Sequence, residues 1–265
     1  MFADMVTFAG VVEHWQNRRL WSPQLGCAPL IPSAMRGASL RRGSLRVSSA
    51  AILLAAAFAA ARAKKTCNVE DYGARGDGIT NCTDAIAKAV ADCAASRGST
   101  VVFPPGIFLS WPLEIPASHD LTFTVNGNLS APADPSAWPS PLPDAYVKFH
   151  KSTGLTLDGR GTINGNGAAW WAIRRKDPSR DAPMLVIIEN AVGATVADVM
   201  LLHSPKFHLV LSNATGTRVT GVRVEAPGDS PNTDAIDPGD GTRDILIEDV
   251  VVSNGDDCVA IKPGT

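Results

Sequence analysis

The sequence predicts an all-β fold, a right-handed parallel β-helix with an N-terminal capping helix, and three observations favour it. Short β-prone runs separated by Gly, Asn or Asp recur at intervals of 23 to 26 residues. The 23 glycines, 19 prolines and 6% aromatic content suit a turn-rich β architecture better than a helical bundle. The one convincing helical pattern lies ahead of these repeats, where a solenoid needs a cap.

Residues 1–63 are expected to lie outside the fold, as an upstream extension followed by a secretory signal peptide. An apolar run at 50–60 is too short to span a bilayer, and Ala61-Arg62-Ala63 after it has the form of a cleavage site. Three arginines precede the run: Arg41, Arg42 and Arg46. Because this pattern begins late, we expect translation to start at Met35; a transit peptide or a signal anchor is the alternative. Secretion is predicted, with no membrane association once the signal is removed.

Residues 64–265 are expected to form one domain, and its charge argues against some functions. Residues 1–63 hold seven arginines and two acids, so leaving them out changes the formal net charge from −2 to −7. No basic cluster occurs beyond the N-terminal arginines, so nucleic-acid binding is not expected. The sequence has no recognisable metal-ligand cluster or phosphate-binding loop, and we expect no metal, no cofactor and a monomer.

Four cysteines remain in this domain: Cys67, Cys82, Cys93 and Cys258. In a secreted chain they permit three pairings, and the sequence leaves the choice open. Cys82 and Cys93 would lie roughly 16 Å apart along one helix, too far for a direct bridge. Three sequons, at Asn81, Asn128 and Asn213, are the expected glycosylation sites of a secreted surface.

The segment Asp84–Ala95 is predicted to be the capping helix. Thr83 can serve as its N-cap, and Ser96–Gly98 ends it. Apolar residues recur at helical spacing: Ile86, Ala89, Val90 and Cys93. The first coil of a solenoid needs a lid over its apolar cross-section, and this helix directly precedes the predicted strand Thr100–Phe103.

Two interleaved series of short strands follow a Pro-rich loop at 131–143. One series starts at intervals of 23, 26 and 24 residues: Val186–Ile188, Leu209–Leu211, Ala235–Asp237 and Val259–Ile261. The other runs in a second register: Leu155–Asp158, Val196–Val199, Val219–Val222 and Ile247–Val250. A solenoid requires such a shared period because each coil buries its apolar side chains only against its neighbours; a β-sandwich does not.

Acidic residues recur one coil apart, just ahead of two of these strands. Asp234, at the end of Ser230–Asp234, is followed 22 and 23 residues later by Asp256 and Asp257. Successive coils place equivalent positions about 4.8 Å apart, so the three carboxylates are predicted to meet on one face. Three acids that close cannot all stay ionised, which provides the proton donor and the proton acceptor that cleavage of a glycosidic bond requires.

Asp and Asn also occur at β-helix turns, where their side chains satisfy backbone groups. This simpler interpretation is preferred for Asp240 and Asp244, but the adjacent acid pair gains nothing as a turn former. His203 and His208 flank a strand and are expected to be structural. The Trp170–Trp171 pair is as consistent with packing as with stacking on a sugar ring.

Three motifs surround the acids: Ser230-Pro-Asn-Thr-Asp-Ala-Ile-Asp-Pro238, Ile247-Glu-Asp-Val250 and Asp256-Asp-Cys-Val-Ala-Ile-Lys262. Two more open the domain: Asp71–Gly78 and Val101–Gly106. Together they resemble the motifs of the polygalacturonase family, glycoside hydrolase family 28, from about Cys67 to the last residue. The resemblance implies a pectin-lyase-like solenoid that acts on pectic polysaccharide in the cell wall. The implied reaction is hydrolysis of α-1,4-galacturonosyl bonds in pectin or polygalacturonate, with inversion.

The resemblance also implies a role for each site residue. Asp256 is the general acid, while Asp234 and Asp257 hold and deprotonate the attacking water. Asn232 and Lys262 are the expected substrate-binding residues. Diagonal carboxylates on neighbouring coils would be about 7–8 Å apart, within the roughly 6.5–9.5 Å range of inverting enzymes.

Two further family motifs, a Gly-His-Gly and an Arg-Ile-Lys, do not occur before the sequence stops at Thr265. The family cysteine that pairs with the position of Cys258 is also missing, so Cys258 is expected to be a free thiol. We therefore expect a C-terminally truncated member that keeps the acids but binds substrate poorly, and is weakly active or inactive. Three alternatives stay open: a hydrolase of another pectic backbone such as rhamnogalacturonan or xylogalacturonan, a calcium-dependent pectate lyase, and a non-catalytic carbohydrate-binding β-helix.

Overall fold

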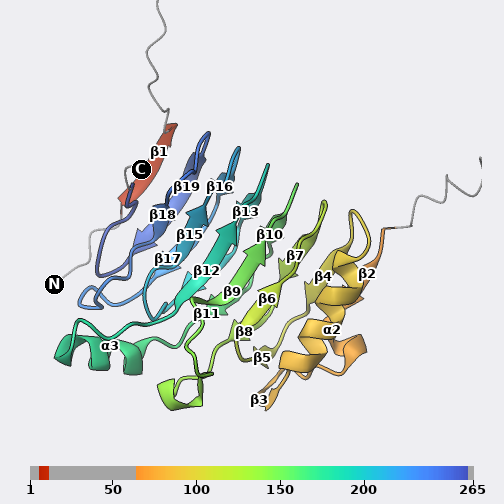
Figure 1. The fold of residues 1–265 in the computed structure, drawn as a ribbon, viewed down its shortest axis with the longest axis horizontal. Helices are drawn as coiled ribbons and strands as arrows, with labels where there is room; N and C mark the ends of the chain where they lie inside the picture. Colours follow the sequence, from red (N-terminus) through yellow and green to blue (C-terminus); the bar gives the residue numbers. More distant parts are fainter. Residues whose placement is uncertain (1–5, 12–63, 262–265) are drawn as a thin grey trace, which may run out of the picture. The chain divides into compact units, whose positions relative to one another are not determined.

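The computed structural model describes residues 64–261 and the backbone of residues 6–11, all within one compact unit. Three rows of strands wind along this unit (Figure 1). Paired strands in the rows are parallel, and each complete coil contributes one strand to each row. This arrangement confirms the predicted parallel β-helix.

The strands of the three rows are as follows. The first row runs through β2 (Thr66–Asn68), β4 (Thr100–Phe103), β7 (Thr122–Val125), β10 (Thr156–Asp158), β13 (Thr195–Ala197), β16 (Arg218–Thr220) and β19 (Leu246–Ser253). The second runs through β3 (Asp77–Asn81), β5 (Ile107–Leu109), β8 (Asn128–Ser130), β11 (Thr162–Asn164), β14 (Met200–Leu202) and β17 (Arg223–Glu225), and joins the first at β19. The third is a separate sheet of β6 (Leu113–Ile115), β9 (Ala145–His150), β12 (Met184–Glu189), β15 (Leu209–Ser212) and β18 (Ile236–Pro238).

The core lies between the three rows and is built from inward positions that stack in register. Phe123, Leu157 and Val196 are direct partners on successive coils, and all three are fully buried. The rings of Phe103 and Phe149 flank that of Phe123, with centroid distances of 4.9 and 5.4 Å. Because the side-chain period of a strand is two, this register turns the intervening positions outward, where functional groups can be displayed.

The first and third rows contain the two strand series that the sequence predicts, whereas the second row was not predicted. Its strands are three to five residues long, and most place a single apolar side chain inward. In β11 only Ile163 is buried, and in β17 only Val224. One apolar residue between polar neighbours leaves no alternation for a sequence pattern to detect.

Helix α2 (Thr83–Ala94) caps the first coil as predicted and packs against β2, β4 and β6. Its buried face consists of the predicted residues: Ile86, Ala89, Val90 and Cys93. The predicted N-cap is wrong: Cys82 occupies that position without a side-chain cap, and the Thr83 hydroxyl instead accepts from the Trp111 amide at 2.8 Å. A disulfide between Cys67 and Cys93, with Cα atoms 6.2 Å apart, joins β2 to α2. Among the described residues, Cys82 and Cys258 are free thiols.

A second helix, α3 (Ala168–Lys176), was not predicted and lies beside the loop that precedes β18. Trp170 and Trp171 are buried in it, and Trp171 Nε1 donates to the Ser204 carbonyl at 2.9 Å. The two Trp side chains therefore have a packing role. Two short 3₁₀ helices complete the fold, η1 (Val69–Tyr72) and, within the expected Pro-rich loop, η2 (Pro135–Ala137).

Strand β1 (Val6–Val11) pairs antiparallel with β19, with Val6 opposite Val252 and Val11 opposite Leu246. Because residues 1–63 were expected to lie outside the fold, this pairing was not predicted. It uses the backbone groups at the edge of β19. The predicted signal peptide and its cleavage site lie outside the described residues. No helix in the described part of the chain is long and apolar enough to cross a membrane.

Candidate active site

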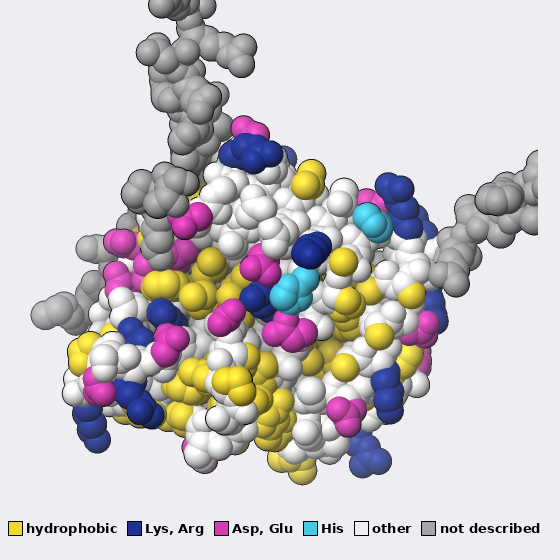
Figure 2. Space-filling model, in the orientation of Figure 1, with side chains coloured by type: hydrophobic (Ala, Val, Ile, Leu, Met, Phe, Trp, Pro, Cys, Tyr) yellow, Lys and Arg dark blue, Asp and Glu magenta, His cyan; other side chains and the backbone are white. Residues whose placement is uncertain are grey.

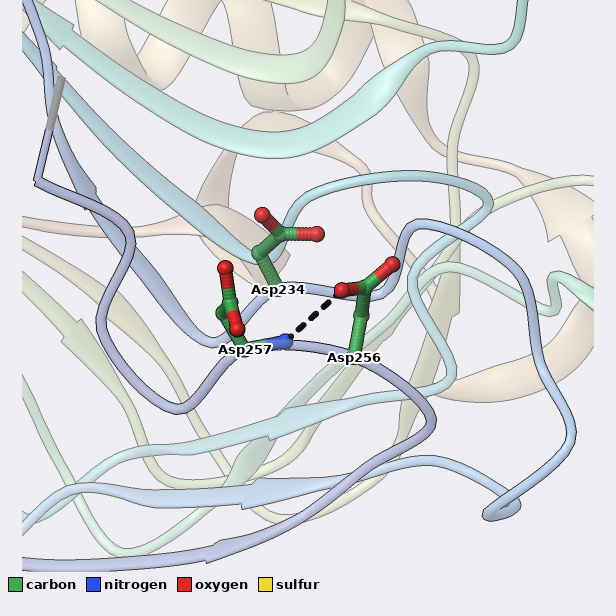
Figure 3. Close-up of side chains that lie close together, drawn as sticks. All are labelled: Asp234, Asp256 and Asp257. Atoms are coloured by element: carbon green, nitrogen blue, oxygen red, sulfur yellow. Dashed lines mark hydrogen bonds between the residues drawn. The ribbon is translucent and has the colours of Figure 1, made fainter.

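Asp234, Asp256 and Asp257 converge at the start of the last described coils. Asp234 lies two residues ahead of Ile236, which opens β18, and Asp257 lies two residues ahead of Val259, which bridges to Ile236 in parallel. One carboxyl oxygen from each acid lies within 4.8 Å of the others. Their carboxylates point to the same side of the two loops that carry them (Figure 3). Acids that are one coil apart in the sequence are therefore only a few ångströms apart in space.

The three acids differ in exposure. Asp234 is buried, at 6% exposure, whereas Asp256 and Asp257 are exposed. The carboxylate of Asp256 accepts a hydrogen bond from the backbone amide of Asp257 at 3.0 Å, which orients it. Facing oxygens within 4.8 Å of one another can share one water molecule, because a water spans two hydrogen bonds of roughly 2.8 Å each. These oxygens are closer than the expected 7–8 Å diagonal and fall below the roughly 6.5–9.5 Å carboxyl separation of inverting enzymes, so the observed spacing does not support that part of the prediction.

The two loops that carry the acids pack backbone against backbone. Ser230 and Thr233 are fully buried, and their hydroxyls lie 2.8 Å apart. The Gly255 amide donates to the Thr233 hydroxyl at 3.1 Å. A Cβ on Gly255 would lie 2.2 Å from the Ser230 carbonyl oxygen, so no side chain fits there. The glycine therefore allows the close approach of the loop at 254–257 to the loop at 230–234.

His208, on the preceding coil, contacts the backbone of the loop at 230–234. Its backbone amide donates to the Asp234 carbonyl at 2.8 Å, and its ring Nδ1 lies 3.2 Å from the carbonyls of both Thr233 and Asp234. Ring Nε2 accepts from the Ser204 amide at 3.3 Å. Complete burial lowers the pKa of His208 to about 4. The ring is therefore neutral near pH 7, with its proton on Nδ1, where it faces two acceptors.

The two predicted substrate-binding residues have different outcomes. Asn232, in a left-handed conformation with φ of +53°, accepts a hydrogen bond at Oδ1 from Nη2 of the buried Arg174 at 2.5 Å. That oxygen is thus directed towards α3. Lys262 lies outside the described residues. Asp237, on β18, is buried at 1% exposure.

The outer face of the five-stranded sheet carries paired charges. Nζ of Lys148 lies 3.1 Å from a carboxylate oxygen of Asp144 and 3.8 Å from one of Glu189. The ring of His150 contacts the carboxylates of Glu189 and Glu114. Basic, acidic and histidine side chains gather near the middle of the face drawn in Figure 2. A polymer lying along this sheet away from the acid site would meet cations that already have acidic partners.

The expected glycosylation sites differ in accessibility. Asn81 and Asn213 are exposed, and Nδ2 of Asn213 donates to Oδ1 of Asn190 at 2.7 Å. Asn128 lies within β8 between two paired strands, and its Oδ1 is buried with no partner among the described residues. A glycan needs an accessible asparagine, so Asn81 and Asn213 are the better placed sites.

Sequence reasoning did not identify the residues that hold the acids in place. Those residues are His208, Arg174 and Asn254. The coil length gives a signal for His208, which precedes Asp234 by 26 residues, the interval between the two strand starts. No comparable signal exists for Arg174, because α3 is an insertion between β11 and β12 whose position the repeat does not fix.

The chemistry of the site also allows a cation. Ca²⁺ binds oxygen ligands at roughly 2.3–2.6 Å, so two ligand oxygens can be about 5 Å apart. Within the described residues, Asp234, Asp256 and Asp257 have oxygens close enough together to share one ion. The same three carboxylates therefore suit two kinds of chemistry, water activation and cation binding.

Comparisons with known proteins agree on one family. The model of the glycosyl hydrolases family 28 matches residues 93–265. A polygalacturonase of Cryptomeria japonica is 34% identical over 213 residues, covering 75% of this chain and 40% of that protein. An exopolygalacturonase of Zea mays is 33% identical over 204 residues, covering 75% of this chain and 49% of that one. The chain thus spans about half, or less, of the length of these curated relatives.

Solved structures resemble this chain in fold. The polygalacturonase from Erwinia carotovora superposes with a TM-score of 0.66 at 26% identity, over 75% of this chain and 58% of that chain. An endo-xylogalacturonan hydrolase from Aspergillus tubingensis gives 0.64 at 25% identity, over 76% and 54%. Both similarities extend over the parallel β-helix described above.

Proposed function

This chain belongs to family 28 of the glycosyl hydrolases, and from that premise we propose that its three acids hydrolyse α-1,4-galacturonosyl bonds of pectic polysaccharide. The observation that carries the proposal is the convergence of Asp234, Asp256 and Asp257, with one oxygen of each within 4.8 Å of the others. One acid is buried and two are exposed, so the group can both contact a bound polymer and hold a water molecule beneath it.

Asp256 acts as the general acid and donates its proton to the glycosidic oxygen as the bond from that oxygen to the anomeric carbon breaks. Asp234 and Asp257 hold a water molecule between them, and one of them takes its proton as the water oxygen attacks the anomeric carbon from the opposite face. Asp256 loses one proton and the base gains one, so each turnover leaves the number of protons on the three acids unchanged. Attack from the opposite face inverts the anomeric configuration.

We expect this chain to bind its substrate weakly. On the outer face of the five-stranded sheet, Lys148 is paired with Asp144 and Glu189. A polyuronate needs local positive charge for tight binding to a chain of net negative charge. We therefore infer weak turnover by this 265-residue chain. We further infer that it acts as a monomer outside the cell, at the cell wall, with glycans on Asn81 and Asn213.

The test is release of reducing ends from polygalacturonate by the purified chain. Wild type is expected to cleave slowly, and Asp256→Asn and Asp234→Asn to lose roughly 10²-fold or more of that rate. Asp244→Asn, an exposed aspartate in the turn after β18, is the matched control and should keep it. Faster cleavage of rhamnogalacturonan or xylogalacturonan would reassign the backbone, and cleavage that survives Asp256→Asn would refute the acid assignment.

A second candidate, a calcium-dependent lyase, is favoured by one observation: the three carboxylates are close enough to share a divalent cation. Hydrolysis by the proposed mechanism should be unaffected by a chelator and should give saturated products. Loss of cleavage with a chelator, recovery with Ca²⁺ and ultraviolet absorbance from an unsaturated product would favour the lyase. Oligogalacturonide binding without any cleavage, unchanged by Asp256→Asn, would indicate a non-catalytic carbohydrate-binding protein.

A further inference from the structure

The side-chain amide of Asn254 joins the two loops that carry the acids. Its Nδ2 donates to the Thr233 carbonyl at 2.7 Å and to the Asp257 carbonyl at 3.0 Å. An amide nitrogen has two protons, so both are used. Thr233 directly precedes Asp234 in the chain. One small group therefore fixes the backbone beside an acid on each of two successive coils.

The Thr233 carbonyl is also held from the other side. Nδ1 of His208, on the coil before, lies 3.2 Å from it. A carbonyl oxygen has two lone pairs and can accept both bonds. The peptide that leads into Asp234 is thus fixed between a donor on the preceding coil and a donor on the following one.

The main-chain ladder alone does not fix these loops. It begins with the bond from the Ala235 amide to the Asp257 carbonyl at 2.9 Å and continues from the Ile236 amide to the Cys258 carbonyl at 3.3 Å. Ahead of Ala235, the described links between the loops come from side chains: the Asn254 amide and the Thr233 hydroxyl, which accepts from the Gly255 amide at 3.1 Å. The carboxylates project from this stretch, so their separation depends on those side-chain bonds.

We propose that Asn254 is a positioning residue that sets the spacing between Asp234 and the Asp256–Asp257 pair. It does not act on the substrate itself. Its catalytic consequence rests on the proposed function, because small displacements of an acid or of its water cost orders of magnitude in rate. Its structural consequence, a fixed distance between the carboxylates, does not depend on that function.

The variant Asn254→Ala removes both donors and adds no charge. Asn166→Ala is the matched control, since it also removes an amide whose Nδ2 donates twice, to Oγ of Ser130 at 2.9 Å and to the Ala131 carbonyl at 2.6 Å, on earlier coils of the same solenoid. Two measurements need no activity: hydrogen exchange of individual backbone amides, and crystal structures of the variants, which give the distances between the carboxylates. A third measures kcat and KM on polygalacturonate.

In Asn254→Ala we expect the amides of Ala235 and Gly255 to exchange roughly tenfold faster, while amides in β12 keep their rates. The carboxylate of Asp234 should lie farther from those of Asp256 and Asp257 than in wild type, where one oxygen of each acid lies within 4.8 Å of the others, because the variant lacks the donor that joins the two loops. We expect kcat to fall by roughly 10²-fold with KM changed little. Asn166→Ala should show none of these effects.

Unchanged distances between the three carboxylates in Asn254→Ala would overturn the proposal, even if local exchange becomes faster. Faster exchange throughout the solenoid would also overturn it, since that is general destabilisation and not positioning. If wild type cleaves no pectic polymer, the proposed function fails, whereas the exchange rates and the carboxylate distances still decide the role of Asn254.

Discussion

Nη2 of Arg174 donates to Oδ1 of Asn232 at 2.5 Å, although the two residues lie 58 positions apart in the sequence. Nη1 of the same buried side chain donates to the Arg180 carbonyl at 2.8 Å. Helix α3 is thereby fastened to the loop that leads into Asp234. Asn232 has a φ of +53°, a backbone conformation that residues other than glycine adopt at an energetic cost. The hydrogen bond from Arg174 offsets part of that cost.

Replacing Arg174 by Met keeps most of the packing volume but leaves Oδ1 of Asn232 and the Arg180 carbonyl without this donor. A hydrogen bond from a charged donor contributes about 1.5–3 kcal/mol, so we expect the free energy of unfolding to fall by roughly 3 kcal/mol. Denaturant unfolding measures it. Arg175→Met is the control: its pair with Asp229, at 3.1 Å, is exposed and should contribute under about 1 kcal/mol. Equal losses in the two variants would contradict a special role for Arg174.

Buried His208 should make the stability of the fold depend on pH. Its pKa is lowered from 6.5 to about 4 because burial disfavours the charged ring. Between these values the unfolded chain binds a proton that the folded ring does not. The contribution of His208 is therefore fully present above about pH 6.5 and is lost as the pH falls towards 4, by about 3 kcal/mol in all.

Denaturant unfolding between pH 7 and pH 4 tests this expectation. The wild-type free energy of unfolding should fall over that range more steeply than that of His208→Asn, whose side chain does not titrate. Should the variant fail to fold, the imidazole signals of wild type at pH 5 decide the matter: a neutral ring protonated at Nδ1 is expected. A charged ring at pH 5 would rule the mechanism out.

Gly255 should tolerate no side chain. An added Cβ would lie 2.2 Å from the Ser230 carbonyl oxygen and 2.7 Å from the Ser230 amide nitrogen, both backbone atoms that cannot move away independently. Gly255→Ala is expected to lower the free energy of unfolding by about 1–3 kcal/mol, because the two acid-bearing loops must separate. It should also reduce any cleavage of polygalacturonate.

Gly228→Ala is the matched control for this substitution. Gly228 precedes the same loop, but a Cβ there meets no atom within 4 Å. Its stability should therefore stay within about 0.5 kcal/mol of wild type. If both variants unfold alike, the close approach at Gly255 does not limit stability.

The meeting of the three acids could be predicted from sequence because it depends on one number, the coil length. Strands such as β12 and β15 place several apolar side chains inward, so their period is visible and the position of Asp234 relative to Asp256 follows. Strands such as β17, with Val224 as its one buried residue, give no pattern, and the second row was missed. The fold class could be predicted from strands such as β12 and β15 alone.

The supporting contacts could not be predicted for a different physical reason. Asn254 and His208 act through side-chain hydrogen bonds to backbone carbonyls. The repeat places His208 one coil ahead of Asp234, but it does not fix the direction of either side chain. The left-handed turn at Asn232 depends on Arg174, which arrives from an insertion outside the repeat. The N-cap of α2 shows the same limit, because the Thr83 hydroxyl bonds to Trp111 and not to its own helix.

The disulfide between Cys67 and Cys93 should be the main covalent support of the capped end. It closes a loop with a sequence separation of 26 residues, which in the chain-entropy account stabilises the fold by about 3 kcal/mol. Cys67→Ser with Cys93→Ser should therefore lower the free energy of unfolding by that amount and speed amide exchange in α2 first. Cys258→Ser, which removes a free thiol at the other end, should leave both unchanged. Peptide mapping that pairs Cys82 with either partner would refute the assignment, because Cys82 is a buried thiol whose sulfur lies 3.2 and 3.3 Å from the Thr80 and Arg75 carbonyl oxygens.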